Sequence, residues 1–254
     1  MKRIAPEAAI YQQRFGLFAK SVLSNMREQL QATKHEIENA NYLSKRVQYN
    51  YLYKGAAMEW YVRIKWKFEK ENFNFYDSLI QDRTRIYDVG CGLGYLSYFL
   101  HYRNTAREIT GIDYDNDKVI FAQNGHDKTD KLKFITGDAR GVGIKNADVV
   151  FFNDVLHYMS FDQQMEVLNR TVDNLNDEGL ILIRDGITDI SNRHNVTQST
   201  EKYSTAIFGF NKTTEALSFF SSKDIFKFAE ERSLTCEMLE QSQKTSNVLF
   251  ILRK

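Results

Sequence analysis

Short apolar runs alternate with amphipathic stretches over the later two thirds of the chain. Strands that alternate with helices in this way predict a parallel sheet with helices on both faces. The last two runs follow each other closely, which predicts an antiparallel pair at the edge of that sheet. The seven runs are RIYDVG, EITGID, KLKFITGD, DVVFFND, GLILIRDG, LTCEMLEQ and NVLFILR.

Residues 1–83 show no strand pattern and predict a helical extension. Between Phe15 and Leu30, apolar side chains recur at spacings of three to four residues, which is typical of a helix with one apolar face. The stretch 49–76 interleaves aromatic and basic side chains. It is open to two interpretations, a helix whose rings fill a core or a surface that meets an acceptor or a membrane. The sequence thus predicts a helical cap over 1–83 and an α/β domain over 84–254.

Composition narrows the classes of function. The chain has 254 residues, of which 43% are hydrophobic, so it can bury a sizeable core. Its 34 basic and 33 acidic side chains nearly cancel, and this balance disfavours nucleic acid as a partner. Two cysteines, and no apolar stretch of the roughly 20 residues that a bilayer requires, predict a cytoplasmic protein without a transmembrane segment.

A glycine-rich loop follows the first predicted strand and reads Asp88-Val89-Gly90-Cys91-Gly92-Leu93-Gly94. Glycines there let the backbone turn tightly and approach a ligand closely. A dinucleotide loop needs a glycine three places after the second one, where this chain has Tyr95, so an NAD(P)-dependent oxidoreductase is disfavoured. The phosphate-binding pattern with a lysine after the last glycine is absent.

This loop resembles the signature of class I S-adenosylmethionine-dependent methyltransferases. The resemblance implies a Rossmann-like, seven-stranded, mostly parallel sheet of order 3-2-1-4-5-7-6, with the last strand antiparallel. It also implies S-adenosylmethionine as the cofactor, held by the loop and by side chains at the next three strand ends. The alternative interpretation is that these carboxylates only cap the helices that follow them. The implied cofactor-binding residues are Asp88, Gly90, Cys91, Gly92, Gly94, Asp113, Tyr114, Asp138, Ala139, Asn153 and Asp154.

Methyl transfer needs a general base only when the acceptor's nucleophile carries a proton. His157 follows the fourth strand and is the leading candidate, because imidazole titrates near neutral pH. Asp185 ends the fifth strand and is the second candidate, for orienting a donor or binding the acceptor. For both, a structural role is the competing interpretation.

The connection after the fifth strand is unusually long and predicts a lid-like insertion over about 187–215. Polar and aromatic groups from this insertion and from the helical cap predict the walls of an acceptor pocket, although surface solvation explains any one of them equally well. The predicted acceptor-binding residues are Tyr53, Trp60, His157, Arg193, His194 and Phe210.

More narrowly, the segments YKGAAMEWYVRIKWKFE, IRDG, RHNVTQSTEKYST and FGFNK are similar to bacterial methyltransferases encoded beside fatty-acid, acyltransferase and aryl-polyene genes. That resemblance implies a phenolic or acyl-chain acceptor, free or presented on a carrier. The oligomeric state stays open.

Two rival functions remain from other classes. A nucleic-acid methyltransferase would use the basic and aromatic residues before the sheet, but the fourth strand ends in NDVLHY rather than in NPPY or DPPY. A protein that binds the cofactor without catalysis is the other, because a fold does not fix a function. No metal is expected, since the histidines lack the paired spacing of zinc motifs. They are His35, His101, His126, His157 and His194.

Overall fold

A computed structural model describes residues 20, 40–51, 56–189, 217–240 and 247–254. The chain divides into two compact units, 1–67 and 68–254. Helix α3 (Ala40–Tyr49) and the first half of α4 (Ala56–Ile80) belong to the first unit. The division into a cap over 1–83 and a domain over 84–254 stays a prediction, and most of the predicted insertion lies outside the described residues.

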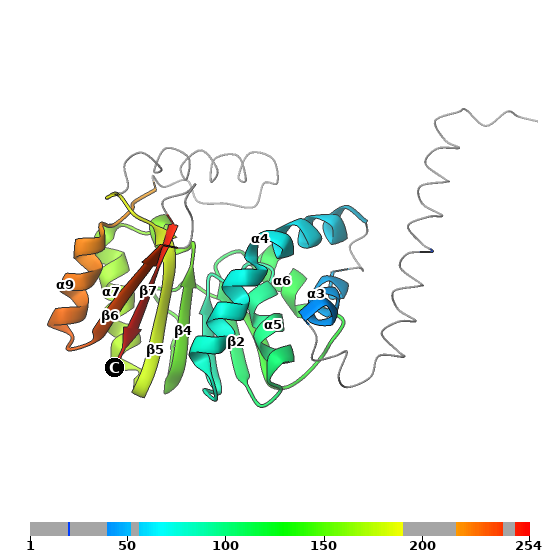
Figure 1. Ribbon diagram of the computed structural model, residues 1–254, viewed down its shortest axis with the longest axis horizontal. Helices are drawn as coiled ribbons and strands as arrows, with labels where there is room; N and C mark the ends of the chain where they lie inside the picture. The colour runs from blue at the N-terminus through cyan, green and yellow to red at the C-terminus, as the bar shows by residue number, and fades with distance from the viewer. Residues whose placement is uncertain (1–19, 21–39, 52–55, 190–216, 241–246) are drawn as a thin grey trace, which may run out of the picture. The chain divides into compact units, whose positions relative to one another are not determined.

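The second unit is built on one seven-stranded sheet of order β3-β2-β1-β4-β5-β7-β6. β7 runs antiparallel to both of its neighbours, and every other pairing is parallel. The predicted fold and strand order are therefore confirmed. Figure 1 shows most of these strands side by side. Their bounds are β1 Arg85–Val89, β2 Glu108–Asp113, β3 Leu132–Thr136, β4 Ala147–Asn153, β5 Leu175–Gly186, β6 Thr235–Glu240 and β7 Asn247–Arg253.

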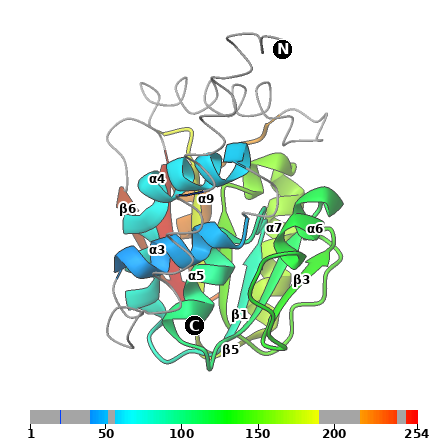
Figure 2. The ribbon, with the colours of Figure 1, turned by 90° about the vertical axis from the view of Figure 1, so that its right-hand side faces the viewer.

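Helices connect the strands and contact both sides of the sheet. Serines cap two of them with reciprocal side-chain to backbone hydrogen bonds: Ser160 before α7 and Ser221 before α9. α6 lies beside β3, as Figure 2 shows, and α9 lies beside β6 at the other end of the sheet. Their bounds are α5 Tyr95–Arg103, α6 Asn116–Gln123, the 3-10 helix η2 Leu156–Tyr158, α7 Phe161–Asp173 and α9 Ser222–Glu231.

Alternation along the strands assigns side chains to the two faces of the sheet. Val150 and Phe152 of β4 belong to the buried cluster that contains the apolar residues of α7 and α9. Phe151, between them, points to the opposite face, where its ring centroid lies 5.5 Å from that of Tyr76 in α4. The central strands are thus covered on both faces, which explains why they read as nearly continuous apolar runs.

A buried ion pair fastens the end of α4 to the corner between α5 and β2. The Arg107 side chain is 3% exposed, and its guanidinium donates to Asp77 Oδ1 at 2.6 Å. It also donates to the carbonyl oxygens of Leu100 and Gln81, both at 3.0 Å. Asp77 accepts a second bond from Arg103 at 2.7 Å. This cluster ties Asp77 and the Gln81 carbonyl, at the end of α4, to the segment that leads into β2.

We predict that Asp77→Ala lowers the free energy of unfolding by about 3 kcal/mol, because it leaves a buried guanidinium without its carboxylate. Urea denaturation measures this difference. The matched control is Asp82→Ala, since Asp82 is exposed near the same end of α4 and should change stability by less than about 0.5 kcal/mol. Equal effects of the two substitutions would show that the ion pair is not important for stability.

Candidate active site

The glycine loop leaves β1 in a conformation that requires its glycines. Gly90, Gly92 and Gly94 have φ values of 78°, 54° and 80°, a region that side-chain-bearing residues rarely adopt. A Cβ on Gly90 would lie 2.7 Å from Val155, and one on Gly94 would lie 2.6 Å from the ring of Phe134. A Cβ on Gly92 would meet nothing within 4 Å, so the middle of the loop borders open space.

Asp113, at the end of β2, holds this loop. Its Oδ2 accepts a hydrogen bond from the Gly92 amide at 2.8 Å, and its Oδ1 accepts one from the Asp115 amide at 2.8 Å. Asp113 is buried, with 9% of its surface exposed. A carboxylate has about four lone-pair positions, and these two bonds use two of them. Asp113 therefore joins the loop to the second strand end and retains capacity for a ligand.

Asp88 lies deeper and has a different environment. It is 2% exposed, and its Oδ2 accepts a hydrogen bond from the Ser97 hydroxyl at 2.6 Å. Burial raises the pKa of Asp88 to about 6, against the lowering effect of the Ser97 hydrogen bond, and the nearby charge of Asp113 contributes to the rise. Burial and the same two carboxylates also raise the pKa of the Cys91 thiol, so this thiol stays protonated and poorly reactive.

At the third strand end, the predicted cofactor-binding residues Asp138 and Ala139 are bonded to arginine side chains. Asp138 pairs with Arg140, whose Nε donates to both carboxylate oxygens at 2.9 Å. This side-chain hydrogen bond is the main reason why the pKa of Asp138 lies below its ordinary value. The Ala139 carbonyl accepts a bond from Arg170 at 2.7 Å, and Tyr114 is 64% exposed. Cofactor contacts at Asp138, Ala139 and Tyr114 stay predictions.

The fourth strand end carries a charged cluster. Asp154 has a φ of 51° and accepts hydrogen bonds from the Arg184 guanidinium and, at 3.0 Å, from the Asn247 amide. Glu69 of α4 lies 3.6 Å from a second guanidinium nitrogen. Burial lowers the pKa of Arg184, but the charges of Asp154 and Glu69 outweigh burial, so its pKa is raised overall. Asn153 lies beside Arg184 in the β4–β5 register.

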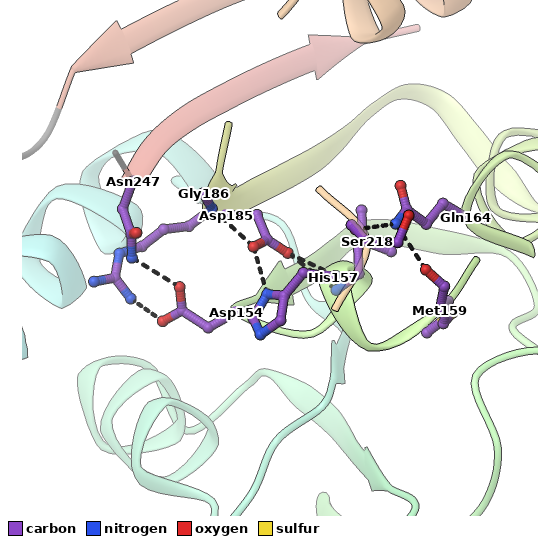
Figure 3. Close-up of polar contacts among 10 residues, drawn as sticks. Asp154, His157, Met159, Gln164, Asp185, Gly186, Ser218 and Asn247 are labelled. Atoms are coloured by element: carbon purple, nitrogen blue, oxygen red, sulfur yellow. Dashed lines mark hydrogen bonds and ion pairs between the residues drawn. The ribbon is translucent and has the colours of Figure 1, made fainter. Parts of the chain in front are cut away.

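His157 and Asp185 form a buried hydrogen-bonded pair. His157 Nδ1 lies 2.6 Å from Asp185 Oδ1, and the two side chains are 2% and 1% exposed. Asp185 also accepts hydrogen bonds from the amides of Leu156, His157 and Gly186 at 3.1, 3.3 and 2.8 Å. Figure 3 shows one ring nitrogen of His157 directed at Asp185 and the other turned away from it. The sequence named both residues, and the structure brings them together.

A strap over residues 217–220 supports His157 from the other side. The Phe219 ring stacks on the imidazole with centroids 5.1 Å apart and planes at 17°. Gln164 is fully buried and donates from its Nε2 to the carbonyl oxygens of Met159 and Ser218 at 2.9 and 2.7 Å. The Ser218 amide in turn donates to the His157 carbonyl at 2.9 Å. The imidazole is thus fixed by a carboxylate on one edge and by a ring on one face.

The structure does not describe several of the predicted acceptor-binding side chains. Tyr53, Arg193, His194 and Phe210 fall outside the described residues, and the Trp60 side chain is likewise not described. Their predicted contacts with an acceptor stay predictions.

Other residues of the site were not singled out from the sequence. Among the site residues that were not predicted, Arg184 alone could have been recognised from the sequence, because it is the charged residue near the end of the apolar run GLILIRDG. The residues missed are Glu69, Ser97, Gln164, Arg184, Phe219 and Asn247.

Within the described ranges, no group of three or more His, Cys, Asp or Glu side chains is arranged to hold a metal ion. No helix in the same ranges is both long and apolar enough to cross a membrane.

Comparison with known proteins adds a family. A family model described as a methyltransferase domain matches residues 80–244. Among curated relatives, the carboxy-S-adenosyl-L-methionine synthase of Shewanella oneidensis is 26% identical over 119 residues, which cover 45% of this chain and 49% of the relative. The chain therefore spans about half the length of the curated relatives that it matches.

Solved methyltransferases share the fold. An O-methyltransferase family protein from Burkholderia thailandensis superposes with a TM-score of 0.56 at 18% identity, covering 74% of this chain and 56% of that one. The magnesium protoporphyrin IX methyltransferase of Synechocystis, solved with bound S-adenosylhomocysteine, gives 0.53 at 15% identity, covering 76% and 84%. At these identities the likeness establishes the fold alone.

The raised pKa of Asp88 predicts that the stability of the chain depends on pH. A buried carboxylic acid whose pKa is raised binds its proton more tightly in the folded chain, so the free energy of unfolding falls as the pH rises from about 4 to about 6. We predict that Asp88→Asn, which retains an acceptor for Ser97, removes this loss and is more stable than the native chain by up to about 3 kcal/mol at pH 7.5.

At pH 4 the two chains should be nearly equal in stability. Urea denaturation at both pH values without cofactor measures the difference. A difference that does not change with pH would show that Asp88 has an ordinary pKa.

Proposed function

The chain belongs to the class I S-adenosylmethionine-dependent methyltransferases, and we propose that it methylates a proton-bearing group of a small-molecule acceptor. The observation that carries this proposal is the His157–Asp185 pair, buried at the carboxyl ends of β4 and β5. Ligands of open α/β sheets collect at this edge. The pair therefore lies where an acceptor would meet the cofactor.

The residues at the first two strand ends fit the cofactor. When bound, S-adenosylmethionine supplies a methyl group activated by its sulfonium. The open space beside Gly92 leaves room for the cofactor's amino-acid portion, and the remaining lone pairs of Asp113 can accept hydrogen bonds from the ribose hydroxyls. Asp88 and Asp113 also supply negative charge that favours a cation.

His157 is the proposed general base. Asp185 accepts amide hydrogens from three residues and is therefore an acceptor toward Nδ1 too, which assigns the His157 hydrogen to Nδ1. Nε2 then has the lone pair that takes the acceptor's proton. The imidazolium that forms is stabilised by the Asp185 carboxylate at 2.6 Å, as a carboxylate does behind a catalytic histidine. A nucleophile without a proton would not need this pair.

In this proposal, the chemical class of the acceptor is inferred from resemblance to other methyltransferases. The structural neighbours include proteins named as O-methyltransferases, and the sequence is similar to bacterial enzymes encoded with fatty-acid and aryl-polyene genes. We therefore place a phenolic or acyl-chain acceptor first, free or on a carrier, in a cytoplasmic biosynthetic reaction.

A second candidate comes from the curated relatives, whose name is carboxy-S-adenosyl-L-methionine synthase. The local similarity over 119 residues favours it, and the proton-accepting pair favours methyl transfer. Mass spectrometry of the nucleoside product distinguishes the two, since S-adenosylhomocysteine has lost a methyl group and the carboxylated nucleoside has gained a carboxyl group.

For the base, we predict that His157→Asn lowers methyl transfer by about 100-fold to 10,000-fold, because asparagine can still donate to Asp185 but cannot take a proton. The rate of labelled methyl incorporation into a panel of phenols measures this. Calorimetry should show the affinity for S-adenosylhomocysteine within about twofold of native. His126→Gln, at an exposed position, is the control. Undiminished transfer by His157→Asn would refute the assignment.

For the cofactor, we predict that Asp113→Ala weakens S-adenosylhomocysteine binding at least about tenfold, since it removes both the ribose acceptor and the hydrogen bond that holds Gly92. Isothermal titration calorimetry measures this. The control Asp130→Ala changes an exposed carboxylate in the loop before β3 and should leave the affinity unchanged. Native affinity in Asp113→Ala, or no binding by the native chain, would remove the basis of the proposed function.

A further inference from the structure

Three buried polar atoms at the strand ends have no hydrogen-bond partner in the described part of the chain: Asn153 Oδ1, Arg184 Nε and Asn247 Oδ1. They come from three neighbouring strands, β4, β5 and β7. Asn153 is the register partner of Arg184, and Asn247 is the partner of Gly186, two residues beyond Arg184. Buried polar atoms are normally paired, so three unpaired ones in adjacent positions point to a missing group.

All three side chains point to the same face of the sheet. Phe152, Ile183 and Val248, their chain neighbours, lie in the cluster with α7 and α9, so alternation places Asn153, Arg184 and Asn247 on the opposite face. That face also carries Phe151 against Tyr76 of α4.

Two of the three positions also meet at Asp154. Its carboxylate accepts a hydrogen bond from the Arg184 guanidinium and one from the Asn247 amide. Figure 3 shows Asn247 reaching toward Asp154 from the start of β7. The polar group therefore gathers around Asp154, which precedes the proposed base by three residues, and its unpaired atoms are buried.

The hydrogen-bonding capacity of the unpaired atoms determines which chemical group can bind to them. Arg184 Nε is a donor, and the two amide oxygens are acceptors. A hydroxyl group both accepts and donates, so it satisfies the donor and one acceptor at once. A carboxylate or phosphate has no hydrogen for the amide oxygens. It would also face Glu69 and Asp154, which already neutralise the guanidinium.

We propose that Asn153, Arg184 and Asn247 form a subsite for a neutral hydroxyl group of the acceptor, separate from the group that His157 deprotonates. An amide oxygen and a guanidinium are not bases, so this subsite holds a hydroxyl without taking its proton. The acceptor is then an uncharged molecule with at least two hydroxyls, such as a dihydroxybenzene. This inference rests on the proposed function and names its substrate class.

Binding of small probes tests the subsite without knowledge of the natural acceptor. The probes are 1,2- and 1,3-dihydroxybenzene, phenol and benzoate, titrated by ligand-observed NMR into the native chain saturated with S-adenosylhomocysteine. We expect at least one dihydroxybenzene to bind about tenfold more tightly than phenol, and benzoate to bind most weakly. Phenol that binds as tightly as both dihydroxybenzenes, benzoate that binds best, or no binding of any probe would overturn the inference.

Variants locate the effect. Asn247→Ala should reduce the affinity for the preferred dihydroxybenzene to that of phenol and leave phenol binding unchanged, and Asn153→Ala should do the same. Asn124→Ala, an exposed cap of α6, should retain the tenfold preference. Thermal melting confirms that each variant is folded. A preference that survives both Asn153→Ala and Asn247→Ala would overturn the inference.

Calorimetry with S-adenosylhomocysteine separates the two levels of the proposal. If the native chain binds the nucleoside but shows no hydroxyl preference, the subsite is wrong and the proposed function stands. If it does not bind the nucleoside, the proposed function fails whatever the probes show. If Asn247→Ala weakens nucleoside binding and not dihydroxybenzene binding, the three atoms serve the cofactor and the subsite is refuted.

Discussion

The buried carboxylate of Asp185 is the interaction on which the candidate site depends. Four hydrogen bonds reach it, three from backbone amides and one from the His157 ring. A carboxylate so deeply buried is tolerated only when its oxygens are satisfied in this way. The same bonds fix the start of η2, so the turn that presents His157 and the charge that supports it are one arrangement. Phe219, from the strap, stacks on one face of the same ring.

Parallel pairing explains why these groups meet. β1, β2, β4 and β5 end at the same edge of the sheet, and each has at or next to its last residue a polar residue that a simple apolar strand would not contain. These residues are Asp88, Asp113, Asn153 and the Arg184-Asp185 pair. Buried strands hold these ends rigidly, because they are packed on both faces. The acidic excess at the first two ends suits a cationic cofactor, whereas the cation at the fifth end is balanced within the protein.

The sequence allowed the fold to be predicted well, because the apolar runs, their order and the resemblance all agreed with the observed sheet. It also placed the glycine loop and named His157 and Asp185 separately. It could not show that the two are paired, since their contact depends on the η2 turn. The sequence also could not show which side chains surround Arg184. Glu69 comes from helix α4, which precedes the sheet, and Asn247 comes from β7, which lies next to the edge strand β6. Asp154 was expected beside the cofactor; a positive φ and its ties to Arg184 and Asn247 are tertiary properties that no local pattern carries.

Arg184 and Asp185 are adjacent in β5 and therefore point to opposite faces of the sheet. Asp185 supports the imidazole on the face shared with α7 and α9, while Arg184 joins Asn153, Asp154 and Glu69 on the face shared with α4. One strand end thus supplies both the charge behind the proposed base and the cation of the proposed subsite. Because backbone pairing with β4 and β7 fixes both residues, neither can move without the other. In the proposed site, the spacing between a held hydroxyl and a reacting one therefore follows from the pairing of β5 with β4 and β7.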